Sequence, residues 1–254
     1  MKPRQVLCLI LLSVFLWGCA QTPETAIGVT GSTNEVAEAN LKLGIEYLRR
    51  GNYDKSLIKL NKALDADPKY PPTHNALGLL YQKLGRPDKA EGYFKRALNL
   101  GPNDPRTLNN YGQFLCANNR YDEAEKAFLK AAGNPIYETP EISLTNAGTC
   151  ALRNNRPDIA ENHFRNALKI NPKVPLALIR MSHISYDQGN YLSARGYLQR
   201  YLEVGSHTAS TLWLGIRIEK ELGDKNTLSS YALLLRNNFP KSEEAKLLRE
   251  SGIK

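Results

Sequence analysis

Two of the four cysteines stand at nearly the same place in two stretches that echo each other. Cys116 lies in "NYGQFLCANNRYDEAE" and Cys150 lies in "NAGTCALRNNRPDIAE", 34 residues further along. A pair of cysteines can form a disulfide, act as a reactive thiol pair, or supply a nucleophile that a neighbouring histidine activates. The choice depends on the compartment and on the elements that carry the two residues.

The other side chains that could take part in catalysis form no recognisable catalytic set. The four histidines never stand four residues apart, and the chain has no His-Glu-x-x-His, glycine-rich phosphate loop or Gly-x-Ser-x-Gly. His183 is expected on the inner face of a helix, where a polar contact is a commoner role than catalysis. Carboxylates such as Asp65 and Glu243 fall at expected helix ends, without the apolar pocket of an acid–base pair. We expect no enzyme activity, no metal and no cofactor.

The N-terminus carries a chemical signal of its own. Lys2 and Arg4 precede the apolar run "VLCLILLSVFLW", and Gly18 and Cys19 follow it. The run is too short to span a membrane and has the segment order of a secretory signal peptide. Its end, "LWGCA", resembles the lipobox of bacterial lipoproteins, in which the cysteine becomes the first mature residue and is acylated. We expect a signal peptide over 1–18 and acylation of Cys19; an ordinary signal peptide with a chance cysteine is the alternative.

The residues that follow Cys19 are typical of a tether. The stretch "AQTPETAIGVTGSTN" is small and polar, without a helical period, and completes the lipidated tether at 19–34. In lipoproteins, Asp at the second mature position commonly signals retention in the inner membrane, so Ala20 favours the outer membrane. The net charge of +9 raises the question of nucleic acid, but export argues against that partner. We expect outer-membrane lipid as a partner, no nucleic acid and no small-molecule substrate.

A period of 34 residues organises the rest of the chain. "LGIEYLRRGNYDKSLIKLNKALDADP" from Leu43 is followed by "LGLLYQKLGRPDKAEGYFKRALNLGP" from Leu77. This order of Leu-Gly, Tyr, a small residue, an aromatic or Leu, Ala and Pro is the tetratricopeptide pattern, a helix pair that stacks on its neighbours. It predicts six repeats over 35–241, and a capping helix and tail over 242–254. The repeats are expected to begin near Ala37, Pro71, Pro105, Glu141, Pro175 and Thr208. The expected fold class is all-α, a right-handed superhelical solenoid with the first helix of each pair on the concave face.

Small and large residues at matched positions predict how the helices pack. Glycines in the first helices lie where the two helices of a pair cross closely, and bulky residues of the second helices fill the space between pairs. The glycines are Gly44, Gly78, Gly112 and Gly148, and the bulky residues are Leu60, Phe94, Phe128, Phe164 and Leu198. Two places depart from the pattern. The segment "AAGNPIYETPE" adds two residues between repeats three and four, and the fifth repeat has Met181-Ser182 in place of Leu-Gly.

This arrangement places Cys116 and Cys150 on adjacent first helices. Such helices pack side by side, so the two Cα atoms could approach the roughly 4.4–6.8 Å that a disulfide needs. An exported chain also meets an oxidising compartment. We predict a disulfide that joins repeat three to repeat four across the irregular segment and stabilises the array by roughly 3–4 kcal/mol. A reactive thiol pair, or a nucleophilic cysteine beside a histidine, is the alternative.

The concave face is expected to hold a protein partner. Its positions are apolar in the first repeat and become polar further along, and an exposed apolar patch usually marks a partner site. A short amphipathic helix or an extended peptide would fit such a groove. The expected groove residues are Leu41, Ile45, Leu48, Leu79, Asn75 and Asn109. Asn110, beside Asn109, is a further candidate for hydrogen bonds to a peptide backbone. The alternative is that the apolar members are covered by the tether or belong to the core.

The chain resembles the type IV pilus biogenesis and stability lipoproteins, the pilotins of the pilus secretin. The features that carry this resemblance are the lipobox "LWGC", the six repeats, and the cysteine pair with "NPIYETP" between them. The resemblance covers essentially the whole chain. It implies that Cys19 is the lipidated residue and that Cys116 and Cys150 are the family's disulfide pair.

The resemblance also implies a function. Its members are anchored in the outer membrane and face the periplasm, where they help the secretin subunit to reach that membrane and multimerise. Pilus assembly and twitching motility would depend on this step. One alternative is a scaffold of similar build for another envelope machine, such as barrel assembly or cell-wall synthesis. The other is an envelope enzyme, for example a cell-wall hydrolase, whose catalytic residues the sequence does not reveal.

Overall fold

The computed structural model describes residues 33–253, and every regular element in that range is an α-helix. The thirteen helices of this range are α1 (Thr33–Arg49), α2 (Tyr53–Ala66), α3 (Pro71–Lys83), α4 (Pro87–Leu100), α5 (Pro105–Ala117), α6 (Tyr121–Ala132), α7 (Pro140–Arg153), α8 (Pro157–Ile170), α9 (Pro175–Asp187), α10 (Tyr191–Leu202), α11 (Ala209–Leu222), α12 (Lys225–Asn238) and α13 (Glu243–Glu250). The expected signal peptide, Cys19 and the tether up to residue 32 lie outside the described residues.

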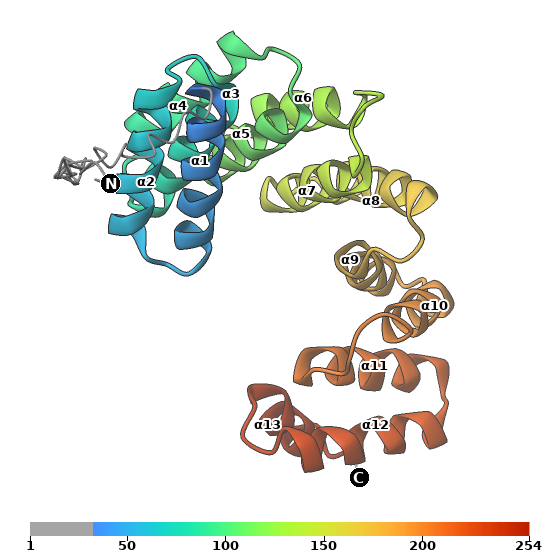
Figure 1. The fold of residues 1–254 in the computed structure, drawn as a ribbon. Helices are drawn as coiled ribbons and strands as arrows, with labels where there is room; N and C mark the ends of the chain where they lie inside the picture. The colour runs from blue at the N-terminus through green and yellow to red at the C-terminus, as the bar shows by residue number, and fades with distance from the viewer. Residues whose placement is uncertain (1–32, 254) are drawn as a thin grey trace, which may run out of the picture.

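The helices stack as six successive pairs, and α13 packs against α11 and α12 at the end of the array. Figure 1 shows the pairs following one another along a single curve, with the last pair and α13 at the bottom. The prediction of an all-α tetratricopeptide solenoid is therefore confirmed. Ser242 caps α13 by accepting a hydrogen bond from the Ala245 N–H, and the buried Ala245 and Leu248 form the apolar side that covers the last pair.

Prolines and left-handed turns set the limits of the helices. A proline occupies the first turn of six of the helices, where its missing N–H costs no hydrogen bond. Within each pair, the turn contains one residue with positive φ, which is glycine in four pairs and asparagine in the third and fourth. Asn119 (φ 61°) and Asn155 (φ 54°) adopt this conformation because asparagine tolerates it better than other residues with a Cβ. All six helix pairs therefore share one turn geometry.

The expected close crossings are present in the core. A Cβ atom at Gly78 would lie 2.8 Å from the ring of Phe94, and one at Gly112 would lie 2.7 Å from the ring of Phe128. The fifth pair reaches the same close crossing without glycine. Ser182 is fully buried there, and its hydroxyl donates a hydrogen bond of 2.8 Å to the Ala194 carbonyl. The hydroxyl is satisfied by the neighbouring backbone, which is why serine is accepted at this position.

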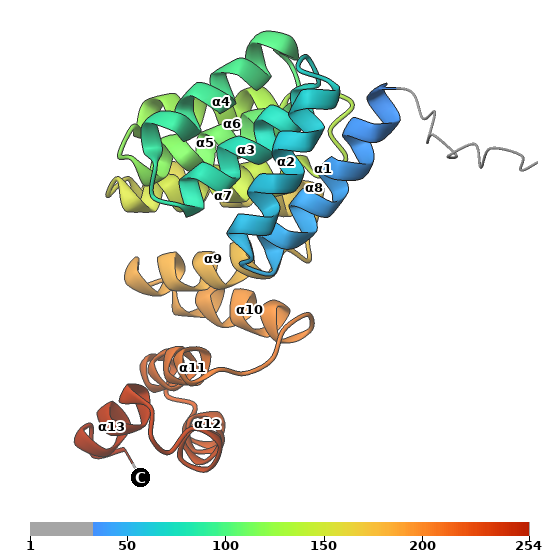
Figure 2. The ribbon, with the colours of Figure 1, turned by 60° about the vertical axis from the view of Figure 1, so that its left-hand side comes forward.

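The first helices form the inner side of the curve. Contacts join α1 with α3, α3 with α5, α5 with α7, and α9 with α11, whereas no two second helices of the described pairs approach each other to the same extent. A stack whose first helices lie closer together than its second helices must curve toward the first helices. In Figure 1, α9 accordingly lies inside α10 and α11 lies inside α12, and Figure 2 shows the same succession from another side.

Candidate partner-binding face

The apolar end of the expected groove is mostly part of the core. Leu41 on α1 is only 5% exposed and packs in a cluster with Leu60 and Leu77, so it is unavailable to a partner and its assignment to the groove is corrected. The sequence period showed the face on which Leu41 lies but not how deeply α3 covers it. Ile45 and Leu48 are half-buried against the same cluster. These two side chains still present part of their surface to solvent.

Leu79 and the expected polar residues lie along α3 and α5. Leu79 is half-buried against the core cluster of repeats two and three. The Asn110 amide donates a hydrogen bond of 3.1 Å to the side-chain oxygen of Asn75, and the Asn146 amide donates one of 2.9 Å to that of Asn109. These bonds run between consecutive first helices, from α5 to α3 and from α7 to α5. The asparagines thus fix the spacing of the inner helices, and Asn109 is buried in doing so.

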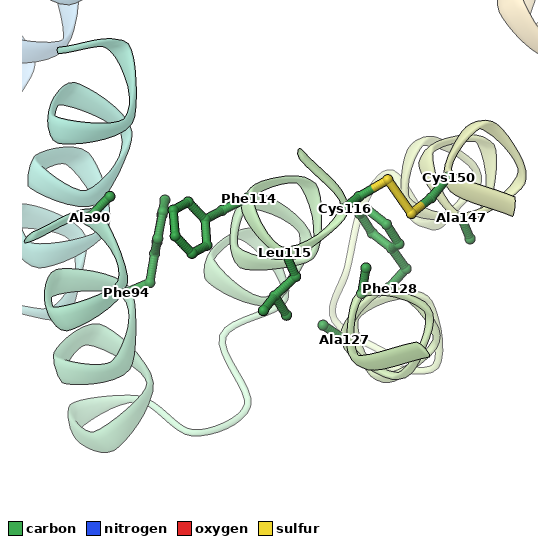
Figure 3. Close-up of a cluster of buried hydrophobic side chains, with 10 residues drawn as sticks. Ala90, Phe94, Phe114, Leu115, Cys116, Ala127, Phe128, Ala147 and Cys150 are labelled. Atoms are coloured by element: carbon green, nitrogen blue, oxygen red, sulfur yellow. A yellow bond between two sulfur atoms is a disulfide. The ribbon is translucent and has the colours of Figure 1, made fainter. Parts of the chain in front are cut away.

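A disulfide joins the third and fourth pairs on this inner side. The sulfur atoms of Cys116 on α5 and Cys150 on α7 are bonded, with their Cα atoms 5.8 Å apart. Both residues are buried, and Figure 3 shows the bond beside Phe128 and Ala147. The bond spans the irregular segment between α6 and α7, so it holds the two inner helices together where the chain departs from the repeat period.

The irregular segment forms the wall of a cleft. The cleft has a volume of about 440 Å³ and lies at the start of α5 and α7. Ile136 in the segment is 79% exposed and Ile142 on α7 is 45% exposed. Its lining consists of Asp104, Pro105, Arg106, Asn109, Asn110, Ile136, Tyr137, Glu138, Thr139 and Ile142. Apart from Asn109 and Asn110, the sequence did not identify these residues as a site; the two extra residues between repeats were the signal that could have done so.

A second hollow lies beside the disulfide, further along the same helices. Its volume is about 260 Å³, and polar and apolar side chains share its lining. It is lined by Gln82, Gln113, Cys116, Ala117, Phe128, Asn146, Thr149, Cys150 and Arg153. Side-chain amides and hydroxyls can exchange hydrogen bonds with the backbone of an extended peptide. The inner side of repeats two to four therefore offers two apolar side chains in one hollow and amide groups in the next.

One carboxylate with a strongly lowered pKa, that of Glu91, forms contacts between two repeats. Glu91 on α4 accepts hydrogen bonds from Arg120 (2.7 Å) and from the Tyr111 hydroxyl (3.1 Å), and it pairs with Lys95 (2.9 Å). Hydrogen bonding to Arg120, and then to Lys95, lowers the pKa of Glu91 to about 2. A carboxylate held ionised in this way stabilises the interface between the second and third repeats. It is unsuited to proton transfer near neutral pH.

Two of the histidines, His74 and His163, are also bound to structural partners. His74 contacts the Pro68 carbonyl at 2.8 Å, and the buried His163 contacts Glu125 at 2.8 Å, which links α8 to α6. Between residues 33 and 253, no three His, Cys, Asp or Glu side chains are grouped as a metal site requires. In the same range, no helix combines the length and the hydropathy needed to cross a bilayer.

The comparisons with known proteins agree with this architecture. Tetratricopeptide-repeat models match residues 35–103, 75–138 and 145–211. The type IV pilus assembly protein PilF of Pseudomonas aeruginosa is 32% identical over 235 residues, which is 92% of this chain and 93% of PilF.

Solved structures extend the comparison. The structure of Pseudomonas aeruginosa PilF has a TM-score of 0.79 at 32% identity, and the match covers 87% of this chain and all of that one. The structure of PilW, a widely conserved type IV pilus biogenesis factor, has a TM-score of 0.74 at 32% identity, with 85% and 99% covered. The stacked helix pairs and this match along almost the whole length show that the chain belongs to the tetratricopeptide-repeat proteins of type IV pilus biogenesis.

Proposed function

We propose that this chain is a pilotin, a lipid-anchored scaffold that promotes the outer-membrane localisation and multimerisation of the type IV pilus secretin. The observation that carries the proposal is the similarity to PilF over nine-tenths of both chains, which includes the solenoid and its inner face. The lipobox-like sequence that ends at Cys19 supports an anchor on the periplasmic side of the outer membrane.

The proposed mechanism is binding without chemical turnover. Acyl chains on Cys19 hold the array at the membrane, and more than one chain is needed for stable anchoring. The inner face binds a segment of the secretin subunit, so bound subunits are concentrated at the bilayer. Assembly of the ring is then favoured by effective concentration. The solenoid fold and the pilus-assembly relatives support such a scaffold.

We propose that the binding face has two parts. The apolar end consists of Ile45, Leu48 and Leu79. These half-buried side chains pack against the core and keep part of their surface exposed to a partner. Ile136 and Ile142 form the apolar part of the cleft. Buried apolar side chains contribute most of the binding energy of such interfaces, at about 25 cal/mol per Å² of apolar area removed from water.

Charged substitutions test the binding face. Ile45→Asp and Ile142→Asp should reduce secretin multimers in outer membranes while the helical content of the purified protein stays unchanged. Ile58→Asp is the matched control, because Ile58 is 55% exposed on α2, outside the inner face. Equal multimer levels in all three variants would contradict the assignment of the binding face.

A separate variant tests the anchor. Cys19→Ser should release the protein from the membrane fraction and leave the secretin mislocalised. An unchanged membrane fraction would remove the proposed lipidation, while the solenoid and its family would stand.

A further inference from the structure

Two arginines on the inner side of the last repeats lack a carboxylate partner. Within the described range, the other three arginines of these repeats are engaged: Arg195 pairs with Glu219 and Asp224, Arg200 donates to the Pro172 carbonyl, and Arg236 donates to the Ile253 carbonyl. Arg180 on α9 and Arg217 on α11 have no carboxylate oxygen within ion-pair distance among residues 33–253. The two helices contact each other, so these charges belong to neighbouring parts of one surface.

The guanidinium group of Arg217 is held in place by an aromatic ring. Its Cζ atom lies 4.5 Å from the centroid of the Tyr186 ring, and Tyr186 in turn lies 5.4 Å from the ring of Tyr191 on α10. The Nε atom of Arg217 is buried without a hydrogen-bond partner, while the residue as a whole is only half-buried. Stacking on an aromatic face fixes the plane of a guanidinium and leaves its outer edge available to an anion.

Arg180, His183 and Tyr186 follow one another at intervals of three residues on α9, so they share the side of this helix on which Arg217 stacks. Burial, and then the charges of Arg217 and Arg180, lower the pKa of His183, while Asp187 opposes this shift. Glu221 follows Arg217 by one turn on α11, and its charge adds to the raised pKa of Tyr186, which burial raises first and Arg217 opposes. Neither Asp187 nor Glu221 is paired with an arginine in this part of the array. These two carboxylates offset the arginine charges at longer range, but neither bonds to a guanidinium group, so Arg180 and Arg217 keep donors available to an added carboxylate.

The position of the cluster on the curve restricts the kind of anion. α9 and α11 lie on the inner side of the array, with α10 and α12 outside them (Figure 1). A bilayer surface is flat on this scale and meets the outer side of a curved solenoid more readily than its inner side. An extended peptide can lie along the inner side, and its side chains can reach successive helices.

We propose that Arg180, His183 and Arg217 form a carboxylate-binding site for an acidic peptide segment. The terminal nitrogens of Arg217 donate to one carboxylate and Arg180 to the same or a neighbouring one, while Tyr186 keeps the Arg217 guanidinium in position. The site goes beyond the proposed function, because it is separate from the apolar binding face and does not require the peptide to come from the secretin.

Fluorescence anisotropy can test the site with the full chain purified in a non-ionic detergent. The probe is a labelled peptide with four consecutive glutamates, and the control probe carries glutamines at the same places. We expect saturable binding of the glutamate peptide alone, which weakens as salt is added. Arg217→Gln and Arg180→Gln should each weaken binding about tenfold, the usual effect of losing a hydrogen bond between charged groups. Arg96→Gln, which removes an exposed arginine of α4 on the outer side, should have no effect.

Further arms of the same experiment separate the sources of the anion. Inorganic phosphate that displaces the peptide at equal concentration would show a site for free anions and overturn the proposal. Vesicles of anionic phospholipid that bind in an Arg217-dependent manner, without binding of the glutamate peptide, would overturn it as well. Arg180 is exposed, so Arg180→Gln leaves the packing intact. Unchanged peptide binding by this variant and by Arg217→Gln would exclude the site.

Discussion

Replacement of both Cys116 and Cys150 by alanine should lower the free energy of unfolding by about 4 kcal/mol. The disulfide closes a loop of 34 residues, and the loss of loop-closure entropy in the unfolded chain gives this figure at 25 °C. Alanine is the suitable substitute because both positions are buried, and a serine hydroxyl would add the cost of an unpaired polar group. The two missing sulfur atoms leave a small gap beside Phe128, which adds to the loss.

Urea unfolding followed by circular dichroism measures the effect. The double variant should unfold at a lower urea concentration than the oxidised wild type. Reduced wild type should approach the variant, and reductant should leave the variant itself unchanged. Because a solenoid can unfold in parts, hydrogen exchange adds a local measure. Amides of α5 and α7 should lose more protection than those of α11 and α12.

One outcome would refute this reasoning. If the oxidised wild type, the reduced wild type and the double variant unfold at the same urea concentration, the bond does not restrain the unfolded chain as the loop length implies. The contacts of α6 with α7 would then be sufficient to hold repeats three and four together.

Three further predictions concern the packing, the turns and the charges. Gly78→Val should destabilise the array by about 1–3 kcal/mol, because its side chain would collide with the Phe94 ring; thermal unfolding measures this. Asn119→Ala should cost about 1 kcal/mol, since alanine disfavours a φ of 61°, while Asn119→Gly should keep or raise the melting temperature. Glu91→Gln should cost roughly 1–3 kcal/mol at pH 7, because the pKa of Glu91 is about 2 in the folded state and near 4.5 when unperturbed. Its stabilisation is fully present above pH 4.5 and is lost as the pH falls toward 2, so the difference in urea midpoint between wild type and variant should shrink over that window.

The repeat period predicted the helices well because the residues that define it act within a single helix pair. Prolines at the first turn and small residues at the crossings fix where helices start and how close they come. The repeat starts expected at residues 71, 105 and 175 coincide with Pro71, Pro105 and Pro175 at the beginning of α3, α5 and α9. Near the irregular segment, the fourth repeat was expected to begin at Glu141, whereas α7 begins one residue earlier, at Pro140.

The binding face could be predicted only in part, because it depends on distances between repeats. The period assigns a residue to the inner side, but the depth of Leu41 depends on how far α3 covers α1. The bond between Asn109 and Asn146 likewise depends on the offset between α5 and α7. The cleft around Ile136 arises from a segment without a period, whose path no repeat rule describes.

The site around Arg217 escaped the sequence analysis for a related reason. Tyr186 and Arg217 lie close to one repeat length apart, so the period places them on adjacent inner helices. It does not show that the guanidinium stacks on the ring, or that neighbouring carboxylates leave it unpaired. Such features follow from side-chain directions across an interface.

The most direct test of the proposed function is the amount of secretin multimer in isolated outer membranes, compared between cells with and without this gene. Heat-resistant multimers can be separated from monomers by gel electrophoresis and quantified with an antibody to the secretin. A pilotin predicts that multimers disappear from the outer membrane, or move to the inner membrane, while monomer persists, and that the intact gene restores them. Equal amounts of outer-membrane multimer in both strains would contradict the pilotin function.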